Sequence, residues 1–204
     1  MQRKSFLSIL TLVFSLGALV AFGLPAHAGD LHGKVACKGV RDSADAVVYV
    51  AAGAGLAGKT FPAPKEHAKM DQMNLVFSPH VLPVLVGTTV DFKNSDAVLH
   101  NVFTAEPCAD KFNLGTWPKG ESKSYTFKRE CAATLLCKVH PEMEAFVVAV
   151  PTPYFAVTKA DGSFHIADLP DGDYTVKVWH PKLKATQKPV KVAGATEANF
   201  EIVK

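Results

Sequence analysis

The chain has 204 residues, with 22 lysines and arginines against 19 aspartates and glutamates, and a formal net charge of +3 at pH 7. This near-balance, with the basic side chains dispersed along the chain, gives no electrostatic footprint for nucleic acid or an anionic membrane. No phosphate-binding loop, Ser-His-Asp arrangement or haem-attachment motif is apparent in the sequence, so we expect the protein not to be an enzyme.

Residues 1–28 have the pattern of a secretory signal peptide. Arg3 and Lys4 precede an apolar run from about residue 6 to residue 24, and Ala26-His27-Ala28 supplies an A-x-A cleavage site. A retained membrane anchor is the alternative, but glycines and a proline interrupt the run. We therefore expect cleavage after Ala28, no membrane span in the mature chain, and a secreted protein, in a bacterium a periplasmic one.

The rest of the chain is predicted to be all-β, because short runs rich in Val, Phe, Thr and Tyr alternate with Gly, Pro and Asp turns. Residues 30–58 hold two such runs, 33–39 and 46–50. Residues 53–69, rich in Gly, Pro, Ala and Lys, have the composition of a linker. Residues 68–151 hold seven or so short strands, which suits a Greek-key sandwich. These strands are expected at 74–77, 83–86, 88–93, 102–104, 122–128, 134–137 and 145–150.

Four side chains in this central segment could hold a metal ion. Cys137, His140 and Met143 follow the compact spacing Cys-x-x-His-x-x-Met, and His100 must come from another strand. A thiolate, two imidazoles and a thioether are the ligands of a trigonal His₂Cys copper site with a weak axial methionine. Zinc sites share the Cys-x-x-His spacing, but the thioether and the distant histidine favour copper. The sequence therefore predicts one copper ion per chain.

The axial position has a competitor. Glu142 lies beside Met143, and a carboxylate ligand there would lower the reduction potential of the metal. A thioether suits Cu(I) and a carboxylate does not, which favours Met143.

Three of these segments, Val90 to Asp96, His100-Asn101-Val102 and the Cys137 loop, resemble the small blue copper proteins, or cupredoxins. The resemblance covers roughly residues 70 to 150, and the short ligand loop is most similar to that of the amicyanins. It implies a cupredoxin sandwich with His100, Cys137 and His140 as equatorial ligands of a type 1 copper ion and Met143 as the axial ligand. It also implies that the amide of Asn101 ties the His100 strand to the ligand loop; an exposed strand residue is the alternative.

Residues 152–204 have a second pattern, in which Asp161-Gly162 and Asp171-Gly172 mark tight turns between strands. They resemble the second half of a carboxypeptidase regulatory-like, or transthyretin-like, β-sandwich, and residues 30–58 resemble its first half. About 53 residues are marginal for an independent core. We therefore expect the copper domain, residues 68–151, to be inserted into a small discontinuous sandwich. Alternatively, residues 31–50 belong to the copper domain.

The remaining cysteines suggest one disulfide. Cys108 lies eight residues after His100, and Cys131 lies six residues before Cys137. If the ligands share one end of a sandwich, the two strands carry Cys108 and Cys131 about 20 Å towards the other end, at ~3.3 Å per residue. A Cys108–Cys131 disulfide is therefore expected, with two unrelated free thiols as the alternative. Cys37 is expected to be a small buried hydrophobic residue.

These patterns favour a secreted carrier of single electrons, whose transient partners would be a dehydrogenase, a cytochrome or an oxidase. A copper-binding or delivery protein is the first alternative, and only the reduction potential and the exchange kinetics separate it from a carrier. The second alternative is an envelope interaction module in which the copper site is subsidiary.

Overall fold

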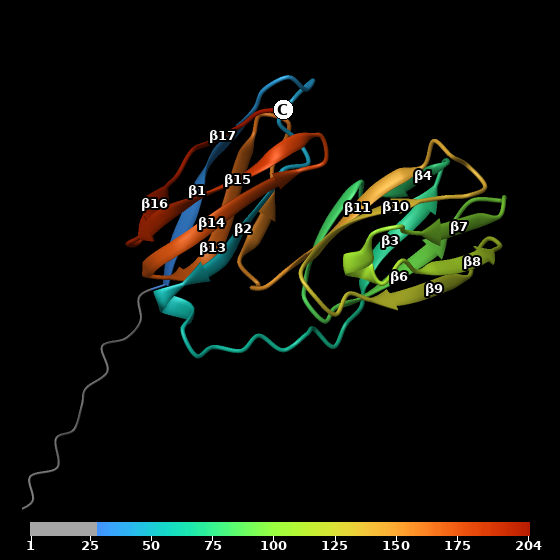
Figure 1. The fold of residues 1–204 in the computed structure, drawn as a ribbon, viewed down its shortest axis with the longest axis horizontal. Helices are drawn as coiled ribbons and strands as arrows, with labels where there is room; N and C mark the ends of the chain where they lie inside the picture. The colour runs from blue at the N-terminus through green and yellow to red at the C-terminus, as the bar shows by residue number, and fades with distance from the viewer. Residues whose placement is uncertain (1–27) are drawn as a thin grey trace, which may run out of the picture.

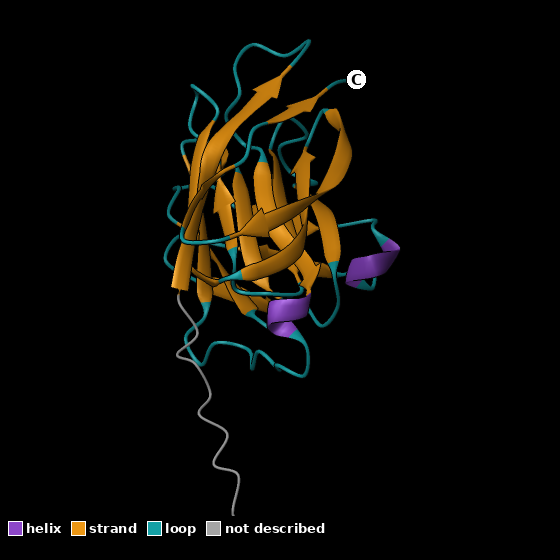
Figure 2. Ribbon diagram, turned by 90° about the vertical axis from the view of Figure 1, so that its left-hand side faces the viewer, coloured by secondary structure: helices purple, strands orange, loops and turns teal. Residues whose placement is uncertain are grey.

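The computed structural model describes residues 28–204, and the predicted signal peptide lies outside them except for Ala28. Within the described part, strands form almost all of the regular structure, and the only helices are two single 3₁₀ turns, η1 (Ala54–Leu56) and η2 (Pro107–Ala109) (Figure 2). None of the described helices is long and apolar enough to cross a membrane. The strands form two lobes that lie side by side (Figure 1).

The first lobe, which we call the central sandwich, consists of two sheets in the orders β5-β11-β10-β7-β8 and β4-β3-β6-β9. Two of its pairs, β3 with β6 and β5 with β11, are parallel, so their strands are joined by crossover connections rather than hairpins. Alternate residues of β10 point inwards to a core between the sheets, where they meet Phe92 and Trp117. The strands are β3 (Ala68–Met73), β4 (Val76–Ser78), β5 (Val81–Leu85), β6 (Thr89–Asn94), β7 (His100–Phe103), β8 (Asn113–Trp117), β9 (Ser122–Thr126), β10 (Cys131–Leu136) and β11 (Glu144–Val150).

Three details of the predicted strands are wrong. Residues 74–77 do not form one strand, because Asn74 and Leu75 have positive φ angles of 58° and 60° and turn the chain between β3 and β4. The expected linker, residues 53–69, overlaps the start of β3, a strand that was not expected; in it Met70 and Gln72 are buried while Asp71 between them is more exposed. β8 was also not expected. All three errors concern short or polar segments, which carry little hydrophobic signal of their own.

The second lobe, the flanking sandwich, combines the first and last strands of the described chain. β1 lies between β13 and the short strands β16 and β17, and β2 lies between β12 and β14. Residues 28–53 therefore share their sheets with residues after 154, and the central sandwich is inserted between them (Figure 1). The strands are β1 (Ala28–Cys37), β2 (Val47–Gly53), β12 (Phe155–Val157), β13 (Ser163–Pro170), β14 (Gly172–His180), β15 (Leu183–Val192), β16 (Ala195–Glu197) and β17 (Phe200–Ile202).

An apolar layer joins the two sandwiches. All residues of β11 after Glu144 are buried, because one face of this strand packs into the central core and the other packs against β2. The layer consists of Val47 and Tyr49 from β2 and Val81, Phe146, Val148 and Val150 from the central sandwich. At its edge, Glu130 accepts a hydrogen bond from Tyr49 Oη at 3.2 Å and pairs with Lys177 Nζ at 3.5 Å. The flanking sandwich thus covers the outer face of β11, which would otherwise be an exposed hydrophobic surface.

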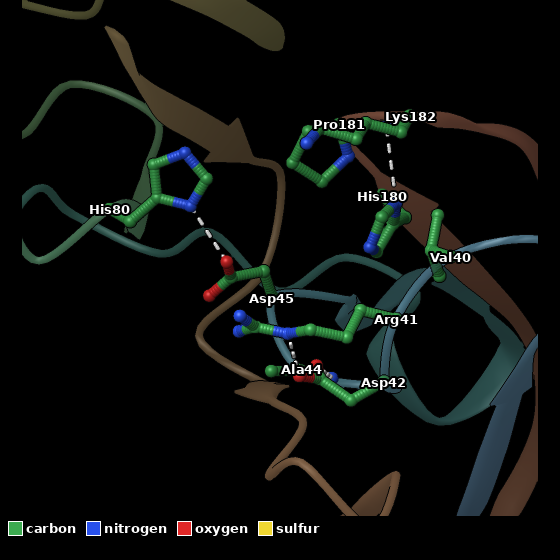
Figure 3. Close-up of a pocket in the computed structure, with 9 residues that line it drawn as sticks. All are labelled: Val40, Arg41, Asp42, Ala44, Asp45, His80, His180, Pro181 and Lys182. Atoms are coloured by element: carbon green, nitrogen blue, oxygen red, sulfur yellow. Dashed lines mark hydrogen bonds and ion pairs between the residues drawn. The ribbon is translucent and has the colours of Figure 1, made fainter. Parts of the chain in front are cut away.

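A pocket of about 440 Å³ opens where the loop after β1 meets the turn between β14 and β15 (Figure 3). Across it, His80 of the central sandwich pairs with Asp45 of the flanking sandwich, with Nδ1 and Oδ2 2.7 Å apart. His180 lies deeper, and its Nδ1 accepts a hydrogen bond from Lys182 N at 3.0 Å. Burial is the main reason why the pKa of His180 lies below its ordinary value. Of the two histidines, His80 thus joins the two sandwiches and His180 accepts a bond within the turn between β14 and β15.

Candidate metal centre

The predicted ligands come from two neighbouring strands and the loop that follows one of them. His100 is the first residue of β7, and Cys137 directly follows β10. These two strands are antiparallel neighbours in one sheet, and Leu136 at the end of β10 pairs with Phe103 at the end of β7, so the start of β7 lies beside the loop that follows β10. His140 and Met143 belong to the loop between β10 and β11, which lies at the end of the central sandwich farthest from the flanking sandwich (Figure 1).

Three donor atoms converge at this end. The Nδ1 atoms of His100 and His140 are 3.1 Å apart, and each lies 4.0 Å from Cys137 Sγ. Metal bonds of about 2.0 Å to nitrogen and about 2.3 Å to sulfur, as in Zn²⁺ sites with these donors, meet close to one point inside such a triangle. The geometry therefore fits a single metal ion held by two imidazoles and a thiolate.

The chemistry of the donors favours copper over zinc. Structural zinc sites are normally closed by four cysteine, histidine or carboxylate donors, and the described residues bring three such groups together here, His100, Cys137 and His140. Two imidazoles and a thiolate with a thioether nearby are the donor set of blue copper sites. Met143 supplies that thioether from the same buried cluster as Cys137, whereas the side chain of Glu142 is exposed.

The four predicted ligands differ in their access to solvent. His100 is fully buried, Cys137 and Met143 are almost so, and His140 is only partly buried. Water therefore has little access to His100, Cys137 and Met143, and the imidazole of His140 is the one of the four that reaches the surface.

Asn101 joins the two ligand-bearing segments, as the resemblance implied. Its backbone N–H points to Cys137 Sγ at 3.4 Å, and its side-chain Oδ1 accepts a hydrogen bond from Lys138 N at 3.3 Å. Its Nδ2 donates to Gly115 O at 2.7 Å and to Asn113 Oδ1 at 2.9 Å. The side chain is buried, so these bonds tie the ligand loop to β7 and β8 without competition from water.

Asp96 is a residue of the site to which the sequence assigned no role. Its Oδ2 lies 2.8 Å from Nε2 of His100, the ring nitrogen that does not face Cys137. Desolvation raises the pKa of Asp96, but hydrogen bonds from Leu75 N, His100 and Asn74 N outweigh it and hold the pKa below its ordinary value. A carboxylate four residues before a ligand histidine was the available signal.

The predicted disulfide between Cys108 and Cys131 is confirmed, with the Cα atoms 5.5 Å apart. It joins η2 to the start of β10, at the end of the central sandwich opposite the predicted ligands. The two cysteines also line a cavity together with Tyr49 and Trp179. Among the described cysteines, Cys37 and Cys137 are free. The thiol of Cys137 is therefore available to a metal.

Comparison with known proteins identifies the central segment. A family model described as copper binding proteins, plastocyanin/azurin family, matches residues 64–150. A search of curated proteins finds no match.

Among solved structures, the chain is similar to a purple cupredoxin from Nitrosopumilus maritimus, with 25% identity and a TM-score of 0.37 over 40% of this chain and 98% of that one. It is also similar to a reduced mutant form of amicyanin, with 22% identity and a TM-score of 0.40 over 52% of this chain and 98% of that one. For a Cu-containing nitrite reductase from Thermus scotoductus SA-01 the identity is 22% and the TM-score 0.41, over 50% of this chain and 27% of that one. With TM-scores below 0.5, these similarities carry no weight for function.

The segment that matches the family model contains the whole donor cluster. Residues 64–150 match the copper binding proteins of the plastocyanin/azurin family, and copper is the cofactor for which His100, Cys137 and His140 are arranged.

Proposed function

We propose that this protein carries single electrons between other proteins through one type 1 copper ion. The observation that supports this most directly is that His100, Cys137 and Met143 are buried while His140 reaches the surface. When bound, copper supplies a centre that exchanges one electron between Cu(II) and Cu(I). His100, Cys137 and His140 would hold the ion, Met143 would supply a thioether, and the bonds of Asn101 would keep these donors in place.

Exposed apolar side chains lie in the segments that carry or contact the predicted ligands. Val139 directly precedes His140, Val98 and Leu99 directly precede His100, and Leu75 is tied to the site through Asp96. We call this surface the apolar patch; its members are Met73, Leu75, Val76, Val98, Leu99 and Val139, each more than 40% exposed. A small apolar surface beside the redox ligand suits brief docking with a partner, because few bonds must break on release.

The proposal extends to the place and partners of the protein. The signal-like leader implies export, in a bacterium to the periplasm, where a dehydrogenase, a cytochrome or a membrane oxidase could give or take the electron. We propose a carrier rather than a copper enzyme because the described residues form a single cluster of metal-binding side chains.

The first experiment tests the copper site by its colour. The purified protein loaded with Cu(II) should show an intense thiolate-to-copper band in the visible range that bleaches on reduction. Cys137→Ser should abolish this band, because the charge-donating sulfur is lost, while Cys37→Ser, which removes the other free thiol, should keep it. A colourless wild-type protein would favour copper binding or delivery over electron transfer, and a band that survives in Cys137→Ser would show that the site assignment is wrong.

The second experiment tests electron transfer through the apolar patch. Leu99→Lys and Val139→Lys should slow electron transfer to a cytochrome c several-fold while the reduction potential stays close to that of the wild type. Val203→Lys is the matched control, because Val203 is similarly exposed but belongs to the flanking sandwich. Equal rates in all three variants would mean that electrons do not leave through this patch.

A further inference from the structure

One carboxylate oxygen joins a copper ligand to the apolar patch. Oδ2 of Asp96 accepts hydrogen bonds from His100 Nε2 at 2.8 Å and from Leu75 N at 2.9 Å. The other oxygen, Oδ1, accepts a bond from Asn74 N at 2.7 Å. The side chain of Asp96 is only 14% exposed, so these bonds are poorly replaced by water.

The turn that Asp96 holds is conformationally unfavourable by itself. Asn74 and Leu75 both have positive φ angles, a region that asparagine tolerates but a leucine rarely adopts. Strain of this kind persists only where surrounding contacts fix the backbone. Both N–H groups of the turn point to the carboxylate of Asp96, which therefore supplies that restraint.

Asp96 is itself held in place from the interior. Its backbone N–H donates to Asn94 Oδ1 at 2.9 Å, and Asn94 is fully buried. The Nδ2 of Asn94 donates to Val98 O at 2.8 Å and to Trp117 O at 2.9 Å. The loop between β6 and β7 thus presents the carboxylate to His100 from a fixed position.

From this geometry we propose that Asp96 is a positioning residue of the copper centre that couples the Asn74–Leu75 turn of the apolar patch to the ligand His100. A histidine that binds a metal through one nitrogen is oriented, and made a stronger donor, by a carboxylate on the other nitrogen. Because His100 and Leu75 share one oxygen, a partner that shifts the turn on docking also changes the hydrogen bond to His100. By thermodynamic reciprocity, the oxidation state of the copper then affects how firmly the partner binds. This inference rests on the proposed electron-carrier function.

The first test uses the intact protein and two matched variants. Asp96→Asn keeps the size of the side chain but removes its charge, so it should raise the reduction potential and weaken Cu(II) binding about 10- to 100-fold. Asp91→Asn is the control, because Asp91 also accepts bonds from a histidine and a serine, His67 and Ser124, but does not contact a ligand. The positioning role is refuted if Asp96→Asn leaves both the potential and the affinity at the values of Asp91→Asn.

The second test examines the coupling. Leu75→Gly relaxes the turn and keeps its N–H, so it should shift the potential in the same direction as Asp96→Asn, and should add little in the double variant. In NMR spectra of the reduced protein, the amides of Asn74 and Leu75 and the Nε2–H of His100 should all exchange faster in Asp96→Asn. A potential that does not respond to Leu75→Gly refutes the coupling.

Failure of the proposed function would look different from failure of this inference. If the wild type had no thiolate-to-copper band, the carrier would be refuted, yet Cu(II) affinity and His100 exchange would still report on Asp96. If the band were present and Asp96→Asn had the same reduction potential and Cu(II) affinity as Asp91→Asn, only the role of Asp96 would be refuted.

Discussion

The ring of Phe146 lies against the indole of Trp179, with centroids 5.5 Å apart. Phe146 belongs to the central sandwich, three residues after Met143, and Trp179 belongs to the flanking sandwich. The rings of His80 and Phe146 also meet nearly at right angles, with centroids 5.5 Å apart. The strand that leaves the ligand loop is therefore packed on its outer face by residues far away in the sequence.

This contact leads to a prediction for the isolated central sandwich. A fragment of residues 68–151 should fold and bind copper, because the core around Phe92 and Trp117 is complete within it. It should also self-associate, because Phe146, Val148 and Val150 lose their cover. Sedimentation and the visible spectrum of the fragment test both statements.

Replacing Phe146 and Val148 by threonine in the fragment should restore a monomer without loss of the colour. A fragment of residues 29–151 should aggregate more than the 68–151 fragment or its threonine variant, because β1 and β2 would present unpaired edges. An unfolded 68–151 fragment beside a soluble, blue 29–151 fragment would mean that the first strands stabilise the copper domain directly.

The axial ligand gives a second prediction. Met143→Leu should keep copper and colour but raise the reduction potential, because a weak donor that favours Cu(II) is removed while the buried volume is nearly kept. Glu142→Gln should leave the potential close to the wild-type value, since the side chain of Glu142 is exposed. Voltammetry of the two variants decides whether Met143 or Glu142 is the axial donor. An unchanged potential in Met143→Leu with a changed potential in Glu142→Gln would assign the position to Glu142.

Loss of the disulfide should affect stability but not the metal site. Replacing Cys108 and Cys131 by alanine should lower the free energy of unfolding by about 3 kcal/mol, since the bond closes a loop across 23 residues. The visible spectrum should not change, because the bond and the ligands lie at opposite ends of the sandwich. Peptide mapping without reductant should show the linked pair with Cys37 unmodified; a bridge to Cys37 would contradict the structure.

His180 predicts part of the acid sensitivity of the protein. Its pKa is held below the ordinary value, chiefly by burial and also by Lys182, although Asp45 and Asp42 act in the opposite direction. The unfolded chain therefore takes up this proton first, and the free energy of unfolding falls as the pH drops below about 6.5.

Denaturant unfolding of the wild type and of His180→Gln at pH 7.5 and pH 5.5, at equal copper loading, measures this contribution. The loss of stability between the two pH values should be smaller in the variant. An equal loss in both proteins would show that His180 does not contribute to it.

The sequence was most informative where the chemistry is local. Cys137, His140 and Met143 lie within seven residues, so their donor set could be recognised without a structure. The spacing of Cys108 and Cys131 from the predicted ligands favoured the disulfide without deciding it, and in the structure Cys108 lies in η2 rather than on a continuation of β7. Asp96 was missed because its role depends on Asn74 and Leu75, which tertiary hydrogen bonds bend into a conformation that their residue types do not predict.

The contact between the sandwiches was hidden for a related reason. The continuous apolar run Val47-Val48-Tyr49-Val50 predicts a strand buried on both faces but does not say what covers each face. In the structure Val48 and Val50 fill the core of the flanking sandwich, and Val47 and Tyr49 meet β11. The likeness of the flanking sandwich to the carboxypeptidase regulatory-like family stays a prediction.

The insertion also sets the order in which the protein can be completed. β1 and β2 leave the ribosome first, yet the strands that pair with them come last, after the entire central sandwich. The copper-binding segment is complete once Val150 has been synthesised. At that point β1 and β2 still have unpaired edges, because the last strand that pairs with them ends only at Ile202. A chain cut short by premature termination or by proteolysis near its C-terminus therefore keeps every copper ligand and loses its protection against aggregation first.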